Sequence, residues 1–205
     1  MSIIEHIFRI IAPHSCVGCG KEGVLLCTAC AQELPAVPAT PTTPPLLPIQ
    51  AATEYTGIAK KLIHCLKFER ANAAAEDIAA LMAQRLVFPE GAIVTHVPTV
   101  PARVRARGYD QAQLIAKAVA RRAQLPYVPL LARSGQQRQV GQGRAARLQQ
   151  MRGAFSVSRP AAATGRHIII VDDVITTGST CAAAATALLA AGAEHVEAAA
   201  FAAAP

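Results

Sequence analysis

The chain has 205 residues, of which 52% are hydrophobic and only 4% aromatic. Its core must therefore be built from Ala, Val, Ile and Leu, which suits an α/β protein better than a β-sandwich. No apolar run approaches the length of a transmembrane helix, and the first residues lack the pattern of a secretion signal. We therefore expect a cytoplasmic protein without a membrane span.

Positive charge is concentrated in one part of the chain. The formal net charge is +7, but residues 99–166 hold thirteen basic residues and a single acid, Asp110. Such a segment calls for a polyanionic partner, which could be pyrophosphate, nucleic acid or both. The alternative is a solvated basic surface with no specific partner.

The first fifty residues divide into three kinds of sequence. A short amphipathic helix is predicted over residues 3–11, and the clustered cysteines follow at 16–30. Six prolines then fall between residues 35 and 48 with almost no charge, which is typical of a linker. The pattern predicts a helix and cysteine module at 1–34, a Pro-rich linker at 35–50 and a main domain at 51–205.

The main domain alternates helical and extended patterns, which predicts a parallel sheet flanked by helices. The polar stretch 133–152, rich in Arg, Gln and Gly, is expected to be a mobile loop or flap. Helices are predicted at 56–68, 72–87, 110–123 and 179–191, and strands at 92–97, 127–131, 154–157, 168–174 and 195–201.

The cysteines predict a metal site. Cys16 and Cys19 form one C-x2-C pair, and Cys27 and Cys30 form a second pair after seven intervening residues. Two such pairs supply the four thiolates of a tetrahedral structural zinc site, and so short a segment cannot form a core of its own. Reduced structural thiols and an iron–sulfur cluster are the alternatives. Disulfides are not expected without a secretion signal.

Residues 167–180 carry the strongest chemical signal. A continuous apolar run at 168–171 is typical of a buried parallel strand, and it ends in Asp172 and Asp173. The Thr/Gly/Ser loop at 176–180 then opens a helix, whose N-terminal backbone N–H groups bind phosphate. Two hydrogen-bond-accepting carboxylates beside a phosphate cradle predict a receptor for a phosphorylated sugar. The alternative is a capped helix with two incidental acids.

This segment resembles the phosphoribosyl-diphosphate (PRPP) signature of the type I phosphoribosyltransferases. The resemblance implies their fold, a central parallel sheet flanked by helices, and a Mg²⁺ ion that bridges the diphosphate and the ribose. It also implies that the two acids bind the ribose hydroxyls, while the loop cradles the 5′-phosphate. The residues concerned are Asp172 and Asp173 as catalytic groups and Thr176, Thr177, Gly178, Ser179 and Thr180 as PRPP contacts.

Further segments narrow the resemblance. Residues 97–111, 55–57, 66–68 and 153–155, together with the cysteine pairs, resemble the ComF family of competence-associated phosphoribosyltransferase-like proteins. The resemblance covers nearly the whole chain. It implies that the turn at 98–108 is the pyrophosphate loop and that 133–152 is the flap. The basic residues it assigns are Arg107 as a catalytic group and Arg103, Arg105 and Lys67 as PRPP contacts.

Two functions follow from these observations. In the first, which we favour, the protein is an enzyme that transfers phosphoribose from PRPP to a nitrogenous acceptor, with Mg²⁺ and arginines stabilising the pyrophosphate that leaves. In the second, it binds PRPP or single-stranded DNA without turnover during DNA uptake, alongside other competence proteins. The sequence does not name the acceptor.

Weaker patterns are set aside. Residues 141–146 fit a dinucleotide-binding fingerprint, but no strand precedes them, so the required context is missing. Cys65 and Cys181 stand alone and are expected to be small buried hydrophobic residues.

Overall fold

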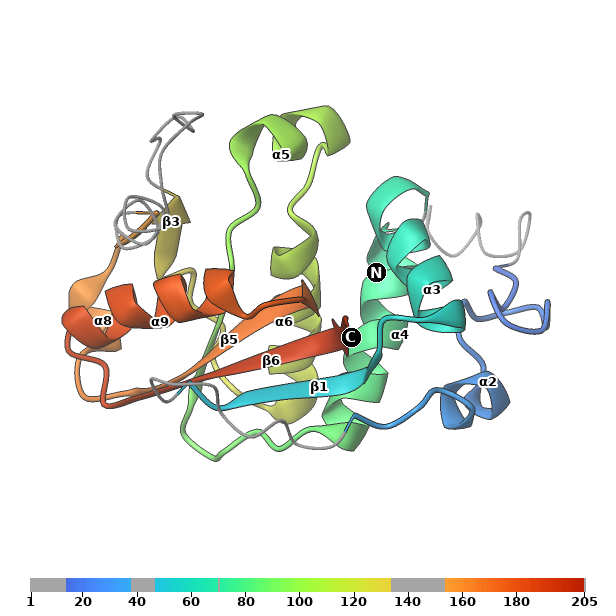
Figure 1. Ribbon diagram of the computed structural model, residues 1–205, viewed down its shortest axis with the longest axis horizontal. Coiled ribbons are helices and arrows are strands. Elements are labelled where there is room, and N and C mark those ends of the chain that lie inside the picture. Colours follow the sequence, from blue (N-terminus) through green and yellow to red (C-terminus); the bar gives the residue numbers. More distant parts are fainter. Residues whose placement is uncertain (1–13, 38–46, 70, 134–153, 205) are drawn as a thin grey trace.

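A four-stranded parallel sheet forms the centre of the molecule (Figure 1). The computed structural model describes residues 14–37, 47–69, 71–133 and 154–204. All three strand pairings are parallel, which confirms the expected α/β fold. In spatial order the strands are β1 (Ile49–Glu54), β6 (His195–Ala203), β5 (His167–Ile175) and β2 (Ile93–His96).

Helices cover both faces of this sheet, so its central strands are buried on both sides. Ile169 and Val171 of β5 pack into one core, whereas Ile168 and Ile170 pack into the other, because successive side chains of a strand point to opposite faces. Burial on both faces explains why the apolar run of β5 is continuous rather than alternating. The first core contains α3 (Gly57–Phe68), α4 (Ala71–Arg85) and α6 (Gln111–Ala123), and the second contains α8 (Pro160–Ala163) and α9 (Ser179–Ala190).

The strand expected at 127–131 is wrong. Tyr127 makes only an isolated bridge to Val94, and the true strand is β3 (Leu131–Arg133), which pairs antiparallel with β4 (Phe155–Val157) in a separate sheet. Pro126 and Pro129 flank and interrupt the expected strand, and proline has no N–H to donate to a ladder.

Other differences concern the first half of the chain. Strand β1 begins at Ile49, within the stretch expected to be linker, and α2 (Thr28–Gln32) starts directly after the third cysteine. The helix expected at 3–11, most of the Pro-rich stretch and all but the first residue of the expected flap at 133–152 lie outside the described residues. The proposed domain boundaries remain predictions. Within the described ranges, no helix is long and apolar enough to cross a membrane.

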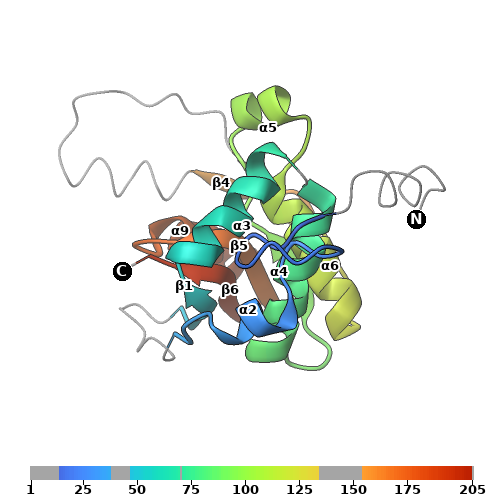
Figure 2. The same ribbon diagram turned by 90° about the vertical axis from the view of Figure 1, so that its right-hand side faces the viewer.

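The cysteine segment packs against α3 and α4, and it faces the viewer in Figure 2. Leu25 and Leu26, between the two cysteine pairs, are buried in the core that these helices share. Their backbone N–H groups both donate to the Oδ2 atom of Asp77 on α4, each at 2.9 Å. One carboxylate thus fixes the loop between the cysteine pairs to the main domain.

Arg85, in the last turn of α4, makes a second attachment. Its guanidinium donates to the carbonyl oxygens of Ala31 at 2.8 Å and of Leu34 and Ala52 at 3.0 Å each. The side chain therefore joins α2, the segment after it and strand β1.

We expect Arg85→Met to lower the free energy of unfolding by about 3 kcal/mol, because it leaves three half-buried carbonyls without a charged donor. Urea denaturation would measure the loss. Arg122→Met is the control: Arg122 is exposed and pairs with the exposed Glu76 at 3.5 Å, so its loss should cost less than about 1 kcal/mol. Equal losses in the two variants would contradict the role of Arg85.

Candidate functional site

The chain topology sets the place of the site. The connection from β2 leads to α6 on one face of the sheet, whereas the connection from its neighbour β5 leads to α9 on the other face. In open parallel sheets, ligands bind outside the carboxyl ends of the strands at such a switch point. The segments that leave these two strand ends are residues 97–110 and 176–178.

Asp172 and Asp173 lie near the carboxyl end of β5, and both are partly exposed. The Nζ atom of Lys67, from the last turn of α3, is 2.8 Å from Oδ2 of Asp173. Desolvation and the neighbouring charge of Asp173 raise the pKa of Asp172 well above its usual range, and the charge of Lys67 partly offsets this. Two carboxylates and one cation from distant segments therefore meet at this strand end.

The loop that follows has the features of a phosphate cradle. Gly178 has a φ of +68°, a backbone conformation that favours glycine, and a Cβ atom there would also come within 3.0 Å of Cδ1 of Ile49. The hydroxyl of Thr177 donates to that of Ser179 at 2.9 Å. The N-cap residue of α9, Gly178, has no side chain to cap the helix, and the Ser179 N–H donates to the Thr177 hydroxyl at 3.5 Å. The backbone N–H groups of a first helical turn are suited to binding an anion.

The expected pyrophosphate turn at 98–108 proves to contain a helix, α5 (Pro101–Arg107). Proline is well suited to the first position of a helix, and Pro101 takes that position in α5. No residue of α5 is buried, and Figure 1 shows it standing away from the sheet. Arg103 and Arg105 are exposed, whereas Arg107 is half-buried.

The end of α5 is attached to the end of α3. The guanidinium carbon of Arg107 lies 5.1 Å from the ring centroid of Phe68, and the Tyr109 hydroxyl donates to the carbonyl oxygen of Leu66 at 2.8 Å. These contacts bring the arginine segment beside the helix end that carries Lys67. No sequence motif that we identified spans α3 and α5, so this contact is visible only in the tertiary structure.

Asp110 joins the two ends of the 99–110 segment through hydrogen bonds. It caps α6 by accepting from the Gln113 N–H at 3.2 Å, as expected, and it also accepts from the backbone N–H of Thr99 at 2.7 Å and its hydroxyl at 2.9 Å. The buried His96 lies 3.9 Å away. Burial lowers the pKa of His96, and the charge of Asp110 acts in the opposite direction.

Arg133 is a site residue that the sequence reasoning missed. Its Nε donates to the carbonyl oxygen of Pro98 at 2.7 Å, and its guanidinium lies 5.0 Å from the ring centroid of Phe155. Burial lowers the pKa of Arg133, while the charge of Asp172 opposes that shift and the charge of Arg103 adds to it. The available signal was its position at the end of an apolar run, where the chain leaves the core.

The structure thus gathers most of the expected residues around the carboxyl end of β5. Lys67 forms an ion pair with Asp173, and Arg107 contacts Phe68 at the same end of α3. The charges of Arg103 and Asp172 both shift the pKa of Arg133. Arg105 makes no hydrogen bond or ion pair with them among the described residues.

Residues 110–205 match the family model described as phosphoribosyl transferase domain. This part of the chain, a little under half of it, is thus similar to phosphoribosyltransferase domains. The match includes Asp110, Arg133, both strand-end aspartates and the 176–180 loop, but it does not include α3, α5 or the cysteines. No curated protein sequence matches the chain.

Two solved structures were also matched. One is glutamine PRPP amidotransferase from B. subtilis complexed with ADP and GMP (25% identity over 62% of this chain and 26% of that chain, TM-score 0.46). The other is an allosteric regulatory enzyme of purine biosynthesis (24% identity over 62% and 25% of the two chains, TM-score 0.47). The present chain spans about a quarter of their lengths.

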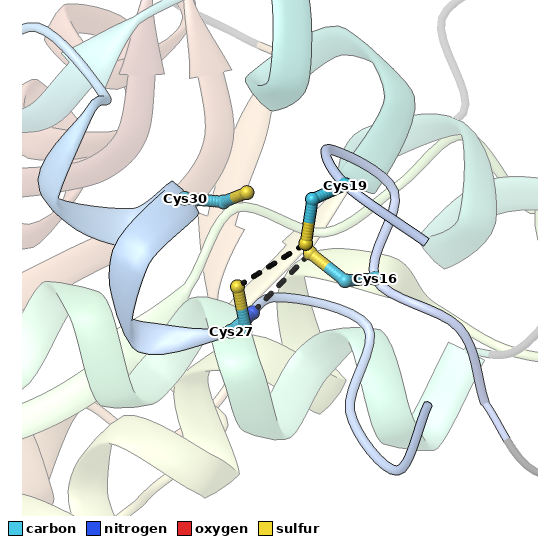
Figure 3. Close-up of side chains that lie close together, drawn as sticks. All are labelled: Cys16, Cys19, Cys27 and Cys30. Carbon is cyan, nitrogen blue, oxygen red and sulfur yellow. Dashed lines mark hydrogen bonds between the residues drawn. The ribbon is translucent and has the colours of Figure 1, made fainter. Parts of the chain in front are cut away.

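The four clustered cysteines form a candidate metal centre outside this domain match (Figure 3). Their sulfur atoms all lie within 4.8 Å of one another, and Cys19 Sγ is 3.6 Å from Cys27 Sγ. Four sulfurs bound about 2.3 Å from a zinc ion would lie about 3.8 Å apart, so the geometry is consistent with zinc. No disulfide joins any of the six cysteines in the described part of the chain, and Cys65 and Cys181 are buried as expected.

The backbone around Cys16 favours the thiolate of that residue, whereas burial raises the pKa of Cys30. Burial alone raises the pKa of Cys16, but hydrogen bonds from the backbone N–H groups of Cys27, Cys19 and Gly18 outweigh it and lower the pKa to about 6. A Cβ atom on Gly18 would lie only 2.6 Å from the Cys30 sulfur. The loop therefore needs a glycine at this position because of close approach.

We expect Gly18→Ala to reduce the bound zinc to less than roughly half of the wild-type content, because the new methyl group displaces the Cys30 sulfur. Metal analysis of the purified protein would measure this. Gly20→Ala is the control, since Gly20 has a φ of +80° but open space around its Cα. It should cost about 1 kcal/mol of stability without loss of metal.

Asp172→Asn should stabilise the free protein, increasingly so at higher pH. The pKa of Asp172 is raised on folding, so the folded state holds its proton more tightly than the unfolded state. The resulting stability is complete below the unfolded pKa and is lost as pH rises through the folded value. Thermal unfolding at pH 5 and pH 8.5 would measure the effect, with the exposed Glu90→Gln as control. A variant advantage that shrinks as pH rises would contradict it.

Proposed function

We propose that this protein binds PRPP and transfers its phosphoribosyl group to a nitrogenous acceptor, as a phosphoribosyltransferase of the ComF type. The observation that carries the proposal is the sequence of groups at the end of β5. Two partly exposed carboxylates are followed within five residues by a glycine turn and the first turn of α9, inside the stretch that matches the phosphoribosyl transferase domain. The accompanying four-cysteine cluster supports the ComF assignment.

The groups of the site suit the parts of PRPP. The N–H groups and hydroxyls of residues 176–180 would bind the 5′-phosphate, where the helix dipole favours negative charge. Asp172 and Asp173 would accept hydrogen bonds from the ribose hydroxyls. Lys67, which neutralises Asp173 in the free protein, would also offer its charge to the incoming phosphates.

The arginines would stabilise the group that leaves. As the acceptor nitrogen forms its bond to C1 of the ribose, the bond from C1 to pyrophosphate oxygen breaks and the electron pair departs with pyrophosphate. The acceptor nitrogen gives its proton to water. Arg103, Arg105 and Arg107 carry fixed positive charge to the face where pyrophosphate would lie, and such preorganised charge lowers the barrier.

Magnesium fits the same strand end. Partly exposed carboxylates are the hard oxygen ligands that Mg²⁺ prefers, and Asp172 and Asp173 would hold it together with PRPP. When bound, the ion would neutralise charge on the diphosphate. Zinc at the four cysteines would be structural, since four thiolates leave no open position for chemistry.

A second candidate function is binding of PRPP or single-stranded DNA without turnover, together with other competence proteins during DNA uptake. The exposed positions of Arg103 and Arg105 on a helix with no buried residue favour it. An exposed row of guanidinium groups suits the phosphates of a nucleic-acid strand as well as pyrophosphate.

Mg²⁺ and PRPP should raise the melting temperature of the wild-type protein. At a concentration one hundred times the Kd, binding adds about 2.7 kcal/mol to the stability. The Asp172→Asn/Asp173→Asn double variant should lose this shift, whereas Glu90→Gln, before the amino end of β2, should keep it. An unchanged melting curve for the wild type would argue against the PRPP site.

Pyrophosphate release separates the two candidates. If the protein is an enzyme, release from PRPP should exceed background with at least one nitrogenous acceptor, and it should fall to background in the double variant. Release at background with every acceptor, despite a PRPP-dependent melting shift, would favour the binding role. In that case, affinity for single-stranded DNA should fall steeply with salt.

A further inference from the structure

Asp110 is the one acidic residue in the basic stretch 99–166, and it ends the segment that carries the three arginines of the candidate site. A negative charge there weakens the attraction of the segment for anions, unless the charge serves another purpose. Only 13% of the Asp110 side chain is exposed, so its carboxylate needs partners within the protein.

Three hydrogen-bond donors converge on this carboxylate. The backbone N–H of Thr99 donates to Oδ2 at 2.7 Å, the Thr99 hydroxyl donates to Oδ1 at 2.9 Å, and the N–H of Gln113 donates to Oδ1 at 3.2 Å. An ionised carboxylate accepts at both oxygens, whereas an asparagine side chain would turn its NH₂ group toward one of these donors. Asp110 thereby joins the two ends of the 99–110 segment.

Burial does not hold this segment in place. None of residues 98–110 is buried, so the hydrophobic effect contributes little to its conformation. Helix α5 has only seven residues, a length that is marginal for a helix in water. Arg103 and Arg107 are four positions apart within it, and like charges at that spacing destabilise a helix. The conformation of the segment therefore depends on polar contacts at its ends.

The contact made by Asp110 differs from the others. Arg133 binds the carbonyl oxygen of Pro98, and the Tyr109 hydroxyl binds that of Leu66, so each of these contacts attaches one end of the segment to another element. Asp110 instead connects one end to the other. It is also the N-cap of α6, whose first turn is buried, so the joined ends are fixed to the core of the molecule.

We propose that Asp110 is a positioning residue, which keeps the 99–110 segment closed so that Arg103 and Arg107 present their charges together to a pyrophosphate group. This inference rests on the proposed function for the identity of that anion. A segment that is already closed loses little conformational freedom when the anion binds, so its apparent affinity is higher than that of an open segment. In this role Asp110 acts through the segment and does not contact the anion.

The test titrates the full chain with inorganic pyrophosphate and, separately, with ribose 5-phosphate, both with Mg²⁺, in a calorimeter. Asp110→Asn removes a negative charge, so electrostatic attraction alone would strengthen pyrophosphate binding. The positioning role predicts the opposite sign, a loss of about tenfold in pyrophosphate affinity. Affinity for ribose 5-phosphate, which lacks the diphosphate, should not change. Asparagine caps helices as well as aspartate does, so α6 should be retained.

Two substitutions at Thr99 test the same hydrogen bonds from the other side. Thr99→Val removes the hydroxyl and should weaken pyrophosphate binding, whereas Thr99→Ser keeps both donors and should bind as the wild type does. Glu76→Gln is the matched charge control, because it removes a surface acid of α4 that pairs with Arg121 and Arg122. It should not weaken pyrophosphate binding.

Unchanged or stronger pyrophosphate binding in Asp110→Asn would overturn the inference. An equal loss of affinity for ribose 5-phosphate would also overturn it, because that result indicates a general loss of structure. A wild type that binds neither ligand would refute the proposed function, and amide hydrogen exchange over residues 100–109 would then decide the inference separately. Faster exchange in Asp110→Asn than in Glu76→Gln would support the closing role of Asp110, and equal exchange would refute it.

Discussion

Burial of β5 on both faces is the constraint on which the site depends. The sheet packs α3, α4 and α6 against one face and α9 against the other, so charged groups can reach solvent from this strand only near its ends. Asp172 and Asp173 lie at the carboxyl end of β5. There the chain passes to the opposite face of the sheet from the one reached by the connection that follows β2. Lys67 then compensates one of the two charges from the neighbouring helix.

Helix α3 connects the two chemical centres of the molecule. Its buried residues pack in one core with Cys16, Cys27 and Cys30, and its last turn carries Lys67 and Phe68. The Lys61 ammonium also donates to the carbonyl oxygen of Val17 in the cysteine loop at 3.3 Å. The cysteine segment therefore acts as a support for the helix that completes the candidate site.

The sequence predicted the parallel sheet and the strand-end aspartates because their signals are local. Its predictions differ from the structure where pairing with distant strands, rather than the local residue pattern, determines the conformation. Strand β1 contains no apolar run, and it is extended because it pairs with β6. The resemblance implied a turn at 98–108, whereas the structure has helix α5 there, with Pro101 as its first residue. Arg133 carried no motif, and its place near Asp172 and Pro98 depends on the pairing of β3 with β4.

The amino-acid sequence by itself determined the spacing of the cysteine pairs and the succession of strand, acids and phosphate loop, because each lies within about fifteen neighbouring residues. Only the tertiary structure decided the partners of those groups. The contacts between Lys67 and Asp173 and between Arg107 and Phe68 join residues far apart in the chain. Such contacts arise from helix packing over the sheet, which no local pattern of residue types encodes.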